Sequence, residues 1–269
     1  MLQDNELRAY NRRGLLPGPE ETEEQFLERV RLLESAAAPE HALSSEEWKE
    51  VHEITERLFD FSVDWVKAFY SDKGLPFWEG AGTWMEKAPQ IQIKSSFRKR
   101  SRISFYRKEE ILAHESVHAA RMAYHCPRFE EHFAFLTSRC GFRKILGPLF
   151  RYPWESAVLL LLLLVSLAAQ AASFYWPEAF WLNSLMLLPW AAPTFGLLRL
   201  TLTRYTLLRC RQNLQPFAQD TLPILVRLTD KEIALFAKSS PQKIQEYIAR
   251  EKEKSLRWRM LAMIYFDSL

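Results

Sequence analysis

Paired cysteines, glycine-rich loops and repeats are all missing from this sequence of 269 residues. Cys126, Cys140 and Cys210 are scattered without paired spacing, which argues against a disulfide scaffold and indicates a reducing compartment. There is no glycine-rich phosphate loop, internal repeat or low-complexity tract. The opening stretch MLQDNELRAYNRRG is polar and charged, so we expect no signal peptide. The net charge of +3 is small, and we infer no nucleic-acid partner from it.

Charge itself is missing from two long runs, residues 156–176 and 179–198. Each run is long enough to cross a bilayer core as a helix that rises about 1.5 Å per residue. Prolines interrupt the second run, which membrane helices tolerate. The alternative is a buried hairpin in a soluble core, but such cores rarely need two adjacent uncharged runs. Tryptophans, which favour membrane interfaces, lie in or near the ends of the runs: Trp154, Trp176, Trp181 and Trp190.

Basic residues flank this pair of runs on their outer sides, whereas the connection 177–178 has none. They are Arg139, Arg143, Lys144 and Arg151 before the first run, and Arg199, Arg204, Arg209 and Arg211 after the second. The positive-inside rule therefore predicts an integral protein of the inner or plasma membrane, with the lipid bilayer as a partner. We expect a cytoplasmic N-terminal domain (1–153), a transmembrane helical hairpin (154–200) and a cytoplasmic C-terminal helical region (201–269).

Helical patterning dominates the soluble regions. Pro19 and the acidic residues after it predict a helix through about residue 35, and Ser44 is expected to cap a second helix that ends near residue 61. Residues 74–84 are rich in glycine and tryptophan and are expected to form a loop. Further helices are predicted over 107–124 and 129–139, and the region after residue 212 is also expected to be helical.

The clear strand signals are residues 91–94 and 102–106, which alternate in polarity and predict a small β-hairpin. Its basic tip, residues 98–100, is either a solvated turn or a contact with anionic lipid headgroups. The expected fold is therefore mostly α with a small β-hairpin and a two-helix transmembrane hairpin.

A possible metal site lies in the stretch ILAHESVHAARMAYHCPRFEEHFAF, residues 111–135. His114 and His118 are one helical turn apart, so both side chains can bind one metal ion. Glu115 is rotated by roughly 100° from His114, which suits contact with a water rather than with the metal. A bound Zn²⁺ ion would activate that water, and Glu115 would take its proton as a general base.

A third ligand is expected on the next helix. The short loop 125–128 predicts that this helix returns antiparallel to the first, which places Glu131 at the level of His118. Glu130 points roughly 100° away and is the weaker alternative. Ala134 is small and permits close approach of the two helices.

Two histidines nearby fit less well as ligands. His125 falls one residue late for the three-histidine pattern H-E-x-x-H-x-x-G-x-x-H, which also has glycine where Arg121 stands. His132 is expected to support a ligand or to face solvent.

The motif His114-Glu115-x-x-His118, followed by Glu131 and Ala134, resembles the gluzincins, a group of zinc metallopeptidases. The resemblance implies a zincin-like pair of helices with His114, His118 and Glu131 as zinc ligands and Glu115 as base. It covers about 30 residues, and the glutamate follows more closely than in the large families of this group. The adjoining membrane helices are similar to those of integral-membrane zinc endopeptidases.

Other residues near the motif are candidates for supporting roles. Arg121 is expected to stabilise an oxyanion or to form a salt bridge behind a ligand, and Tyr106 and Tyr124 are weaker candidates for the oxyanion role. Residues 103–106 directly precede the motif helix. They are expected either to bind substrate as an added strand or simply to pack on the helices.

Two functions follow from these patterns. The first is a membrane-anchored zinc endopeptidase that acts on a peptide or protein, membrane-associated ones included. The second is a non-catalytic helical adaptor or regulator, in which the histidines are structural or bind a metal without turnover.

Overall fold

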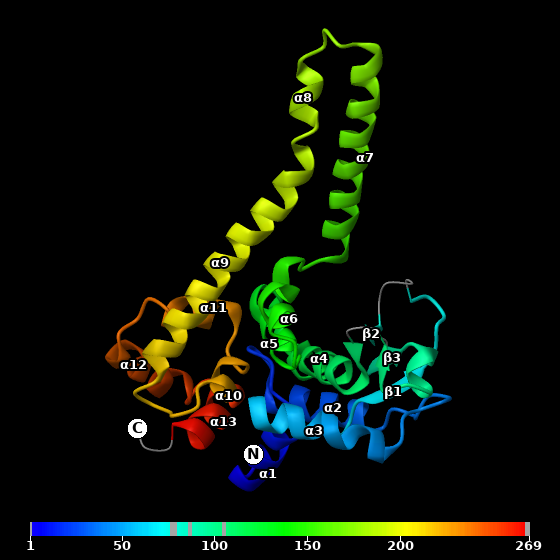
Figure 1. The fold of residues 1–269 in the computed structure, drawn as a ribbon. Helices are drawn as coiled ribbons and strands as arrows, with labels where there is room; N and C mark the ends of the chain where they lie inside the picture. Colours follow the sequence, from blue (N-terminus) through cyan, green and yellow to red (C-terminus); the bar gives the residue numbers. More distant parts are fainter. Residues whose placement is uncertain (1, 76–79, 86–87, 104–105, 267–269) are drawn as a thin grey trace.

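The computed structural model describes residues 2–75, 80–85, 88–103 and 106–266. Helices dominate, with a few short strands, as expected. Figure 1 shows a broad body that contains both ends of the chain, from which a long helical hairpin projects.

The N-terminal helices are α1 (Asp4–Arg12), α2 (Glu23–Glu34) and α3 (Ser45–Phe59). The helices predicted after Pro19 and Ser44 are confirmed as α2 and α3. Thr22 caps the N-terminus of α2, since its side chain accepts a hydrogen bond from the Gln25 N–H, and Ser44 takes part in a similar capping box at α3.

The predicted β-hairpin is wrong, because its two segments belong to different sheets. Strand β3 (Pro89–Ile93) lies between β1 (Lys67–Tyr70), which is parallel to it, and β2 (Ala81–Met85), which is antiparallel. Both hydrogen-bonding edges of β3 are therefore occupied. The later segment contains β4 (Arg102–Ile103) and β5 (Tyr106–Arg107), which pair with each other. Residues 104 and 105 of that segment lie outside the described residues.

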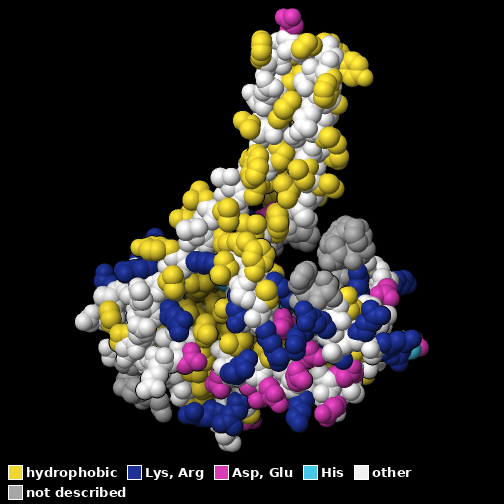
Figure 2. Space-filling model, in the orientation of Figure 1, with side chains coloured by type: hydrophobic (Ala, Val, Ile, Leu, Met, Phe, Trp, Pro, Cys, Tyr) yellow, Lys and Arg dark blue, Asp and Glu magenta, His cyan; other side chains and the backbone are white. Residues whose placement is uncertain are grey.

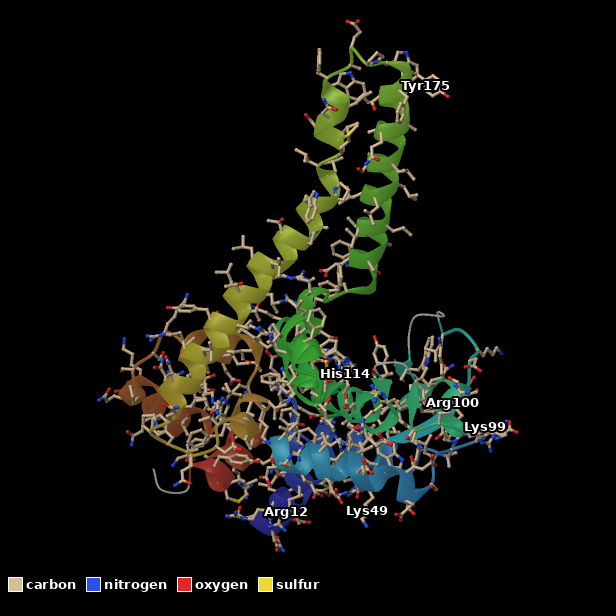
Figure 3. All side chains as sticks on the ribbon, viewed as in Figure 1. Arg12, Lys49, Lys99, Arg100, His114 and Tyr175 are labelled. Atoms are coloured by element: carbon tan, nitrogen blue, oxygen red, sulfur yellow. The ribbon has the colours of Figure 1, made fainter. Side chains whose placement is uncertain are left out.

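The expected loop over 74–84 is also partly wrong, because its end belongs to β2. Glycine in this segment concealed the strand alternation. Between β3 and β4, the short 3₁₀ helix η1 (Ser95–Arg98) leads to the basic residues. Lys99 and Arg100 are exposed on the flank of the body, away from the base of the hairpin, as Figure 3 shows. This position favours the solvated turn over the lipid contact.

The motif helix is α4 (Lys108–Arg121), and it continues through the 3₁₀ helix η2 (Met122–Tyr124). His125 has a φ of 49°, which reverses the chain, and Pro127 begins α5 (Pro127–Leu136). Next come α6 (Gly141–Leu146) and η3 (Gly147–Leu149). Helix α4 packs against α3, α5 and β2, so it is central to this half of the body.

The projecting hairpin consists of α7 (Pro153–Tyr175), α8 (Trp181–Leu185) and α9 (Leu188–Leu214). The segments Trp154–Tyr175 and Trp181–Leu214 are each long and apolar enough to cross a membrane. Only 11% of the most apolar window of each is buried, whereas the core helix of a soluble protein would be mostly buried. Figure 2 shows hydrophobic side chains over the visible face of the hairpin and charged ones over the body.

Two arginines of α9 attach the hairpin to the body. Arg199 donates to the Leu149 carbonyl and to the Glu155 carboxylate, both at 2.8 Å. Arg204 donates to the carbonyls of Lys144 and Ile145 at 2.9 and 2.6 Å. The α6–η3 segment is therefore held against the base of the hairpin.

Beyond the hairpin come α10 (Leu222–Leu225), α11 (Asp230–Phe236), α12 (Pro241–Glu251) and α13 (Leu256–Tyr265). They share one hydrophobic core with the N-terminal helices. Buried Arg227 joins the two parts, since it donates to the Phe59 carbonyl at 2.7 Å and to Asn11 Oδ1 at 2.6 Å.

Candidate metal centre

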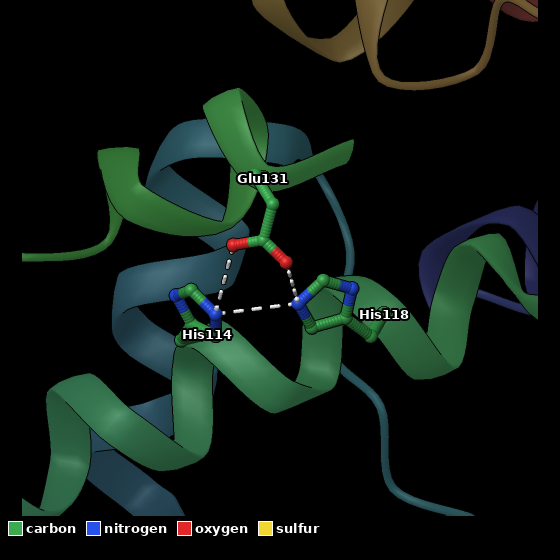
Figure 4. Close-up of side chains that lie close together, drawn as sticks. All are labelled: His114, His118 and Glu131. Carbon is green, nitrogen blue, oxygen red and sulfur yellow. Dashed lines mark hydrogen bonds and ion pairs between the residues drawn. The ribbon is translucent and has the colours of Figure 1, made fainter. Parts of the chain in front are cut away.

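His114, His118 and Glu131 lie together between α4 and α5. The histidines project from successive turns of α4, and the reversal at His125 brings α5 back so that Glu131 faces them. Figure 4 shows the three side chains directed toward one another. They form a cluster of ligating groups with the composition of a metal site.

The distances within this triad suit a single small cation. The two Nε2 atoms are 3.2 Å apart. Glu131 Oε1 lies 3.4 Å from His118 Nε2, and Glu131 Oε2 lies 3.6 Å from His114 Nε2. Tetrahedral ligand bonds of about 2.0–2.1 Å separate neighbouring ligand atoms by about 3.3 Å. The observed separations therefore match the size of a tetrahedral site.

Each histidine ring is also held from its other side. His118 Nδ1 lies 2.6 Å from Glu130 Oε1. His114 forms a hydrogen bond with the backbone carbonyl of Ala134 and packs edge-on against Phe135 at 4.7 Å between ring centroids. Such partners hold a histidine ligand in one tautomer and one orientation. Both Nε2 atoms are left to face the triad.

The cluster is rich in negative charge. Burial alone lowers the pKa of His118, but its hydrogen bond with Glu130 and the charges of Glu131 and Glu115 raise that pKa to about 9. Burial and the nearby glutamates raise the pKa of Glu131. Burial and the nearby positive charges of His118 and Arg143 lower the pKa of His114 well below its usual value. The same negative charges that favour a proton on His118 would also stabilise a cation bound between the triad's side chains.

Glu115 forms a hydrogen bond with the sheet. Its Oε2 accepts a hydrogen bond of 2.6 Å from Thr83 Oγ1 on β2. Among the described strands, β2 pairs only with β3, so its other edge has no strand partner. The carboxylate therefore contacts a strand at the edge of the described sheet and lines the same pocket as His114.

A pocket of about 190 Å³ adjoins the cluster. It is lined by the residue before β2 and by residues of β2, β5 and helices α4 to α6: Gly80, Ala81, Tyr106, Ile111, His114, Glu115, Phe135 and Arg143. Arg143 lies 3.3 Å from Glu110 Oε2 and stacks over the Tyr106 ring at 4.3 Å. The pocket therefore contains a histidine of the triad, the candidate base and a fixed cation.

Arg121 does not reach this pocket, which corrects its expected role. Its side chain is fully buried and donates to the carbonyls of Val226 and Leu228. Tyr124 is likewise buried, under the guanidinium of Arg121. The last residues of α4 have turned toward the C-terminal helices, so both side chains contribute to packing between the two halves of the body.

The remaining histidines are also separate from the triad. His132 is buried, so it does not face solvent, and burial together with the charges of Arg204 and Arg151 lowers its pKa to about 4. His125 forms the turn between the helices. Neither belongs to the metal-ligand cluster found among the described residues.

Three residues of the site were not recognised from the sequence. Thr83 lies in the segment expected to be a loop, and Arg143 was noted only as a charge flanking the membrane. Glu130 was considered as a ligand, but not as the partner of His118 Nδ1. The adjacent Glu130–Glu131 pair was the one sequence signal that could have identified a ligand together with its support.

Comparisons with protein-family models, with curated proteins and with solved structures found no match for this chain.

Proposed function

We propose that this protein is a membrane-anchored, zinc-dependent endopeptidase with a zincin-like pair of helices, α4 and α5. The observation that carries the proposal is the convergence of His114, His118 and Glu131, with Glu115 beside them at a sheet edge. The gluzincin resemblance of the motif points to the same residues in the same roles.

The ligand set favours zinc over other common ions. Mg²⁺ and Ca²⁺ prefer sites built from oxygen atoms, whereas two imidazole nitrogens and one carboxylate suit zinc. Three protein ligands also leave one tetrahedral position for water or substrate, which is typical of catalytic zinc. A bound zinc ion supplies Lewis-acid chemistry that makes water a nucleophile near neutral pH.

The residues of this chain provide the rest of the reaction. Glu115 takes the proton of the attacking water, and the Thr83 hydroxyl orients the carboxylate that receives it. Arg143, rather than Arg121, is the cation in the pocket, and there it stabilises negative charge on the substrate carbonyl oxygen.

The edge of β2 that no described strand occupies is the best place for an extended substrate. A peptide that pairs with this edge would run beside Glu115 and the pocket. Main-chain hydrogen bonds of this kind bind peptides with little dependence on side chains. This edge takes the role that the sequence suggested for residues 103–106, of which 104 and 105 lie outside the described residues.

The hairpin anchors this site to a bilayer. Two adjacent helices of the right length, exposed along the hairpin, support a double crossing. Basic residues at the body end support an arrangement in which both soluble regions lie in the cytoplasm.

One observation favours the second candidate, a non-catalytic adaptor. His118 already has glutamate partners at 2.6 and 3.4 Å, so the cluster is satisfied as an ion-pair network without a metal. Such a network would hold α4 against α5, and this structural role requires no catalytic activity.

Zinc content and turnover separate the two candidates. The full chain, purified in detergent, is expected to hold one zinc ion by elemental analysis. His114→Ala and His118→Ala should lose it, because two remaining protein ligands hold zinc poorly. Glu115→Gln should keep its zinc and lose ~10²–10⁴ in the rate of cleavage of a peptide library.

Glu53→Gln is the matched control, since this exposed glutamate on α3 lies outside the cluster. If neither wild type nor Glu53→Gln contains zinc, the result would support the non-catalytic adaptor, in which the cluster is an ion-pair network. Equal cleavage by wild type and Glu115→Gln would refute the peptidase mechanism.

A further inference from the structure

The segment between the metal centre and the hairpin exposes large apolar side chains. Phe142 and Ile145 lie three residues apart on α6 and are 70% and 52% exposed. Phe150, Tyr152 and Trp154 continue the exposed series to the start of α7. We call these five residues the platform. Exposed apolar groups that adjoin one another usually mark an interaction site.

Basic residues accompany the platform. Lys144 and Arg151 lie between these residues in the sequence; both are half-buried, and no salt bridge of either is found among the described residues. Aromatic and aliphatic side chains interleaved with cations are typical of segments that lie in the headgroup region of anionic membranes. The platform also runs directly into α7, the first of the two apolar helices.

The same short helix forms a wall of the pocket. Arg143 lies between Phe142 and Lys144 in sequence, yet its guanidinium turns inward to Glu110 and Tyr106. Phe135, another lining residue, packs so closely on Gly147 that an added Cβ there would clash with its ring. Figure 3 shows His114 in the part of the body that lies below the base of the hairpin.

We propose that the platform lies in the headgroup layer of an anionic bilayer, so that the pocket opens beside the membrane surface. The site then takes polypeptide held at that surface, such as a segment next to the membrane anchor of another protein. The choice of substrate rests on the proposed peptidase function, whereas the position of the platform does not. A bilayer is favoured over a protein partner because the platform is continuous with the apolar hairpin and is interspersed with Lys144 and Arg151.

The position of the platform is tested by the depth of a fluorescent probe. Phe142→Cys is labelled in a chain that also carries Cys126→Ser and Cys140→Ser, with buried Cys210 left in place. The full chain is reconstituted into vesicles of phosphatidylcholine and phosphatidylglycerol that contain spin-labelled lipid. Leu32→Cys is the control, because Leu32 is 56% exposed but lies on α2, far from the hairpin (Figure 1).

The label at 142 is expected to be quenched and blue-shifted, and the label at 32 to behave as in water. Equal behaviour of the two labels would overturn the proposal. If the label at 142 is quenched equally in vesicles of pure phosphatidylcholine and in vesicles that contain phosphatidylglycerol, the basic residues do not contribute to binding of the anionic headgroups.

The substrate class is tested with one peptide library in two forms, free in solution and linked to a lipid anchor in the same vesicles. Wild type should cleave the anchored form faster. The double variant Phe142→Asp, Ile145→Asp should keep its zinc content and lose this preference. Equal rates for the two forms in wild type would overturn the proposed substrate class. Cleavage of neither form would refute the peptidase function itself, while the probe-depth result would still decide the position of the platform.

Discussion

Glu130 provides the sharpest test of the metal centre, because sequence and structure assign it different effects. From the sequence, Glu130 points away from the metal and Glu130→Gln should leave zinc affinity nearly unchanged. In the structure, Glu130 Oε1 lies 2.6 Å from His118 Nδ1. Glu130→Gln replaces this charged acceptor with a neutral amide of almost the same shape. We therefore expect zinc affinity to fall.

The size of the loss follows from the contact. A hydrogen bond to a charged group contributes about 1.5–3 kcal/mol, and supporting partners of metal ligands typically contribute ~10–100-fold in affinity. Both side chains are 20% exposed, so solvent weakens the interaction and the lower end of that range applies. We expect a loss of about tenfold, or about 1.4 kcal/mol. Glu131→Gln should lose more, because it removes a ligand.

The loss should also depend on pH. The metal-free His118 has a pKa of about 9, so at pH 7 a proton competes with zinc for its Nε2. Glu130 strengthens the binding of both proton and zinc, and its removal therefore weakens the competitor as well as the metal. The difference between wild type and Glu130→Gln should accordingly be smaller at pH 7 than at pH 9.

The measurement is a competition titration against a fluorescent zinc chelator, with the full chain in detergent at both pH values. Glu53→Gln is again the matched control. If Glu130→Gln and wild type bind zinc equally well at both pH values, Glu130 does not support His118 as a zinc ligand.

Three further predictions concern other parts of the molecule. Thr83→Val removes the donor to the carboxylate base and should lower kcat by about tenfold or more with zinc content unchanged; an unchanged kcat would exclude that role. A cysteine at position 178 should react with an impermeant reagent from the side opposite both termini, and reaction from the same side would reject the hairpin. Arg257→Met leaves buried Glu232, 2.5 Å from it, without its ion-pair partner and should cost about 3–5 kcal/mol in thermal unfolding, whereas Glu251→Gln, which removes an ion pair with the exposed Arg250, should cost little.

The helices of the fold and the triad were the parts that the sequence could predict. Helix periodicity, capping residues and the two uncharged runs all depend on neighbours close in sequence, and the elements they predicted are present. The third member of the triad was inferred from loop length and helix geometry. The structure brings Glu131 to His114 and His118, while their binding of a metal stays a prediction.

The sheet and the outer contacts of the site could not be predicted in this way. The partners of β3 come from segments on both sides of it in sequence, and β2 follows a glycine-rich stretch with no clear alternation. Arg121 looked close to the site along the helix, but its direction was decided by the carbonyls of Val226 and Leu228, more than 100 residues later. Contacts at such separations have no local sequence signal.

The long-range hydrogen bonds of Arg227 determine when the N-terminal half can finish folding during synthesis. Its hydrogen bonds to the Phe59 carbonyl and to Asn11 join residues that are 168 and 216 positions apart in the sequence. The apolar hairpin lies within both of these segments. During synthesis, α1 and α3 leave the ribosome long before the residues that cover them. We therefore expect the hairpin to enter the bilayer while the N-terminal half is still incomplete, with its apolar surface open to chaperones. A nascent chain stalled before residue 222 should be sensitive to protease, and resistance should appear only once the last helices have emerged.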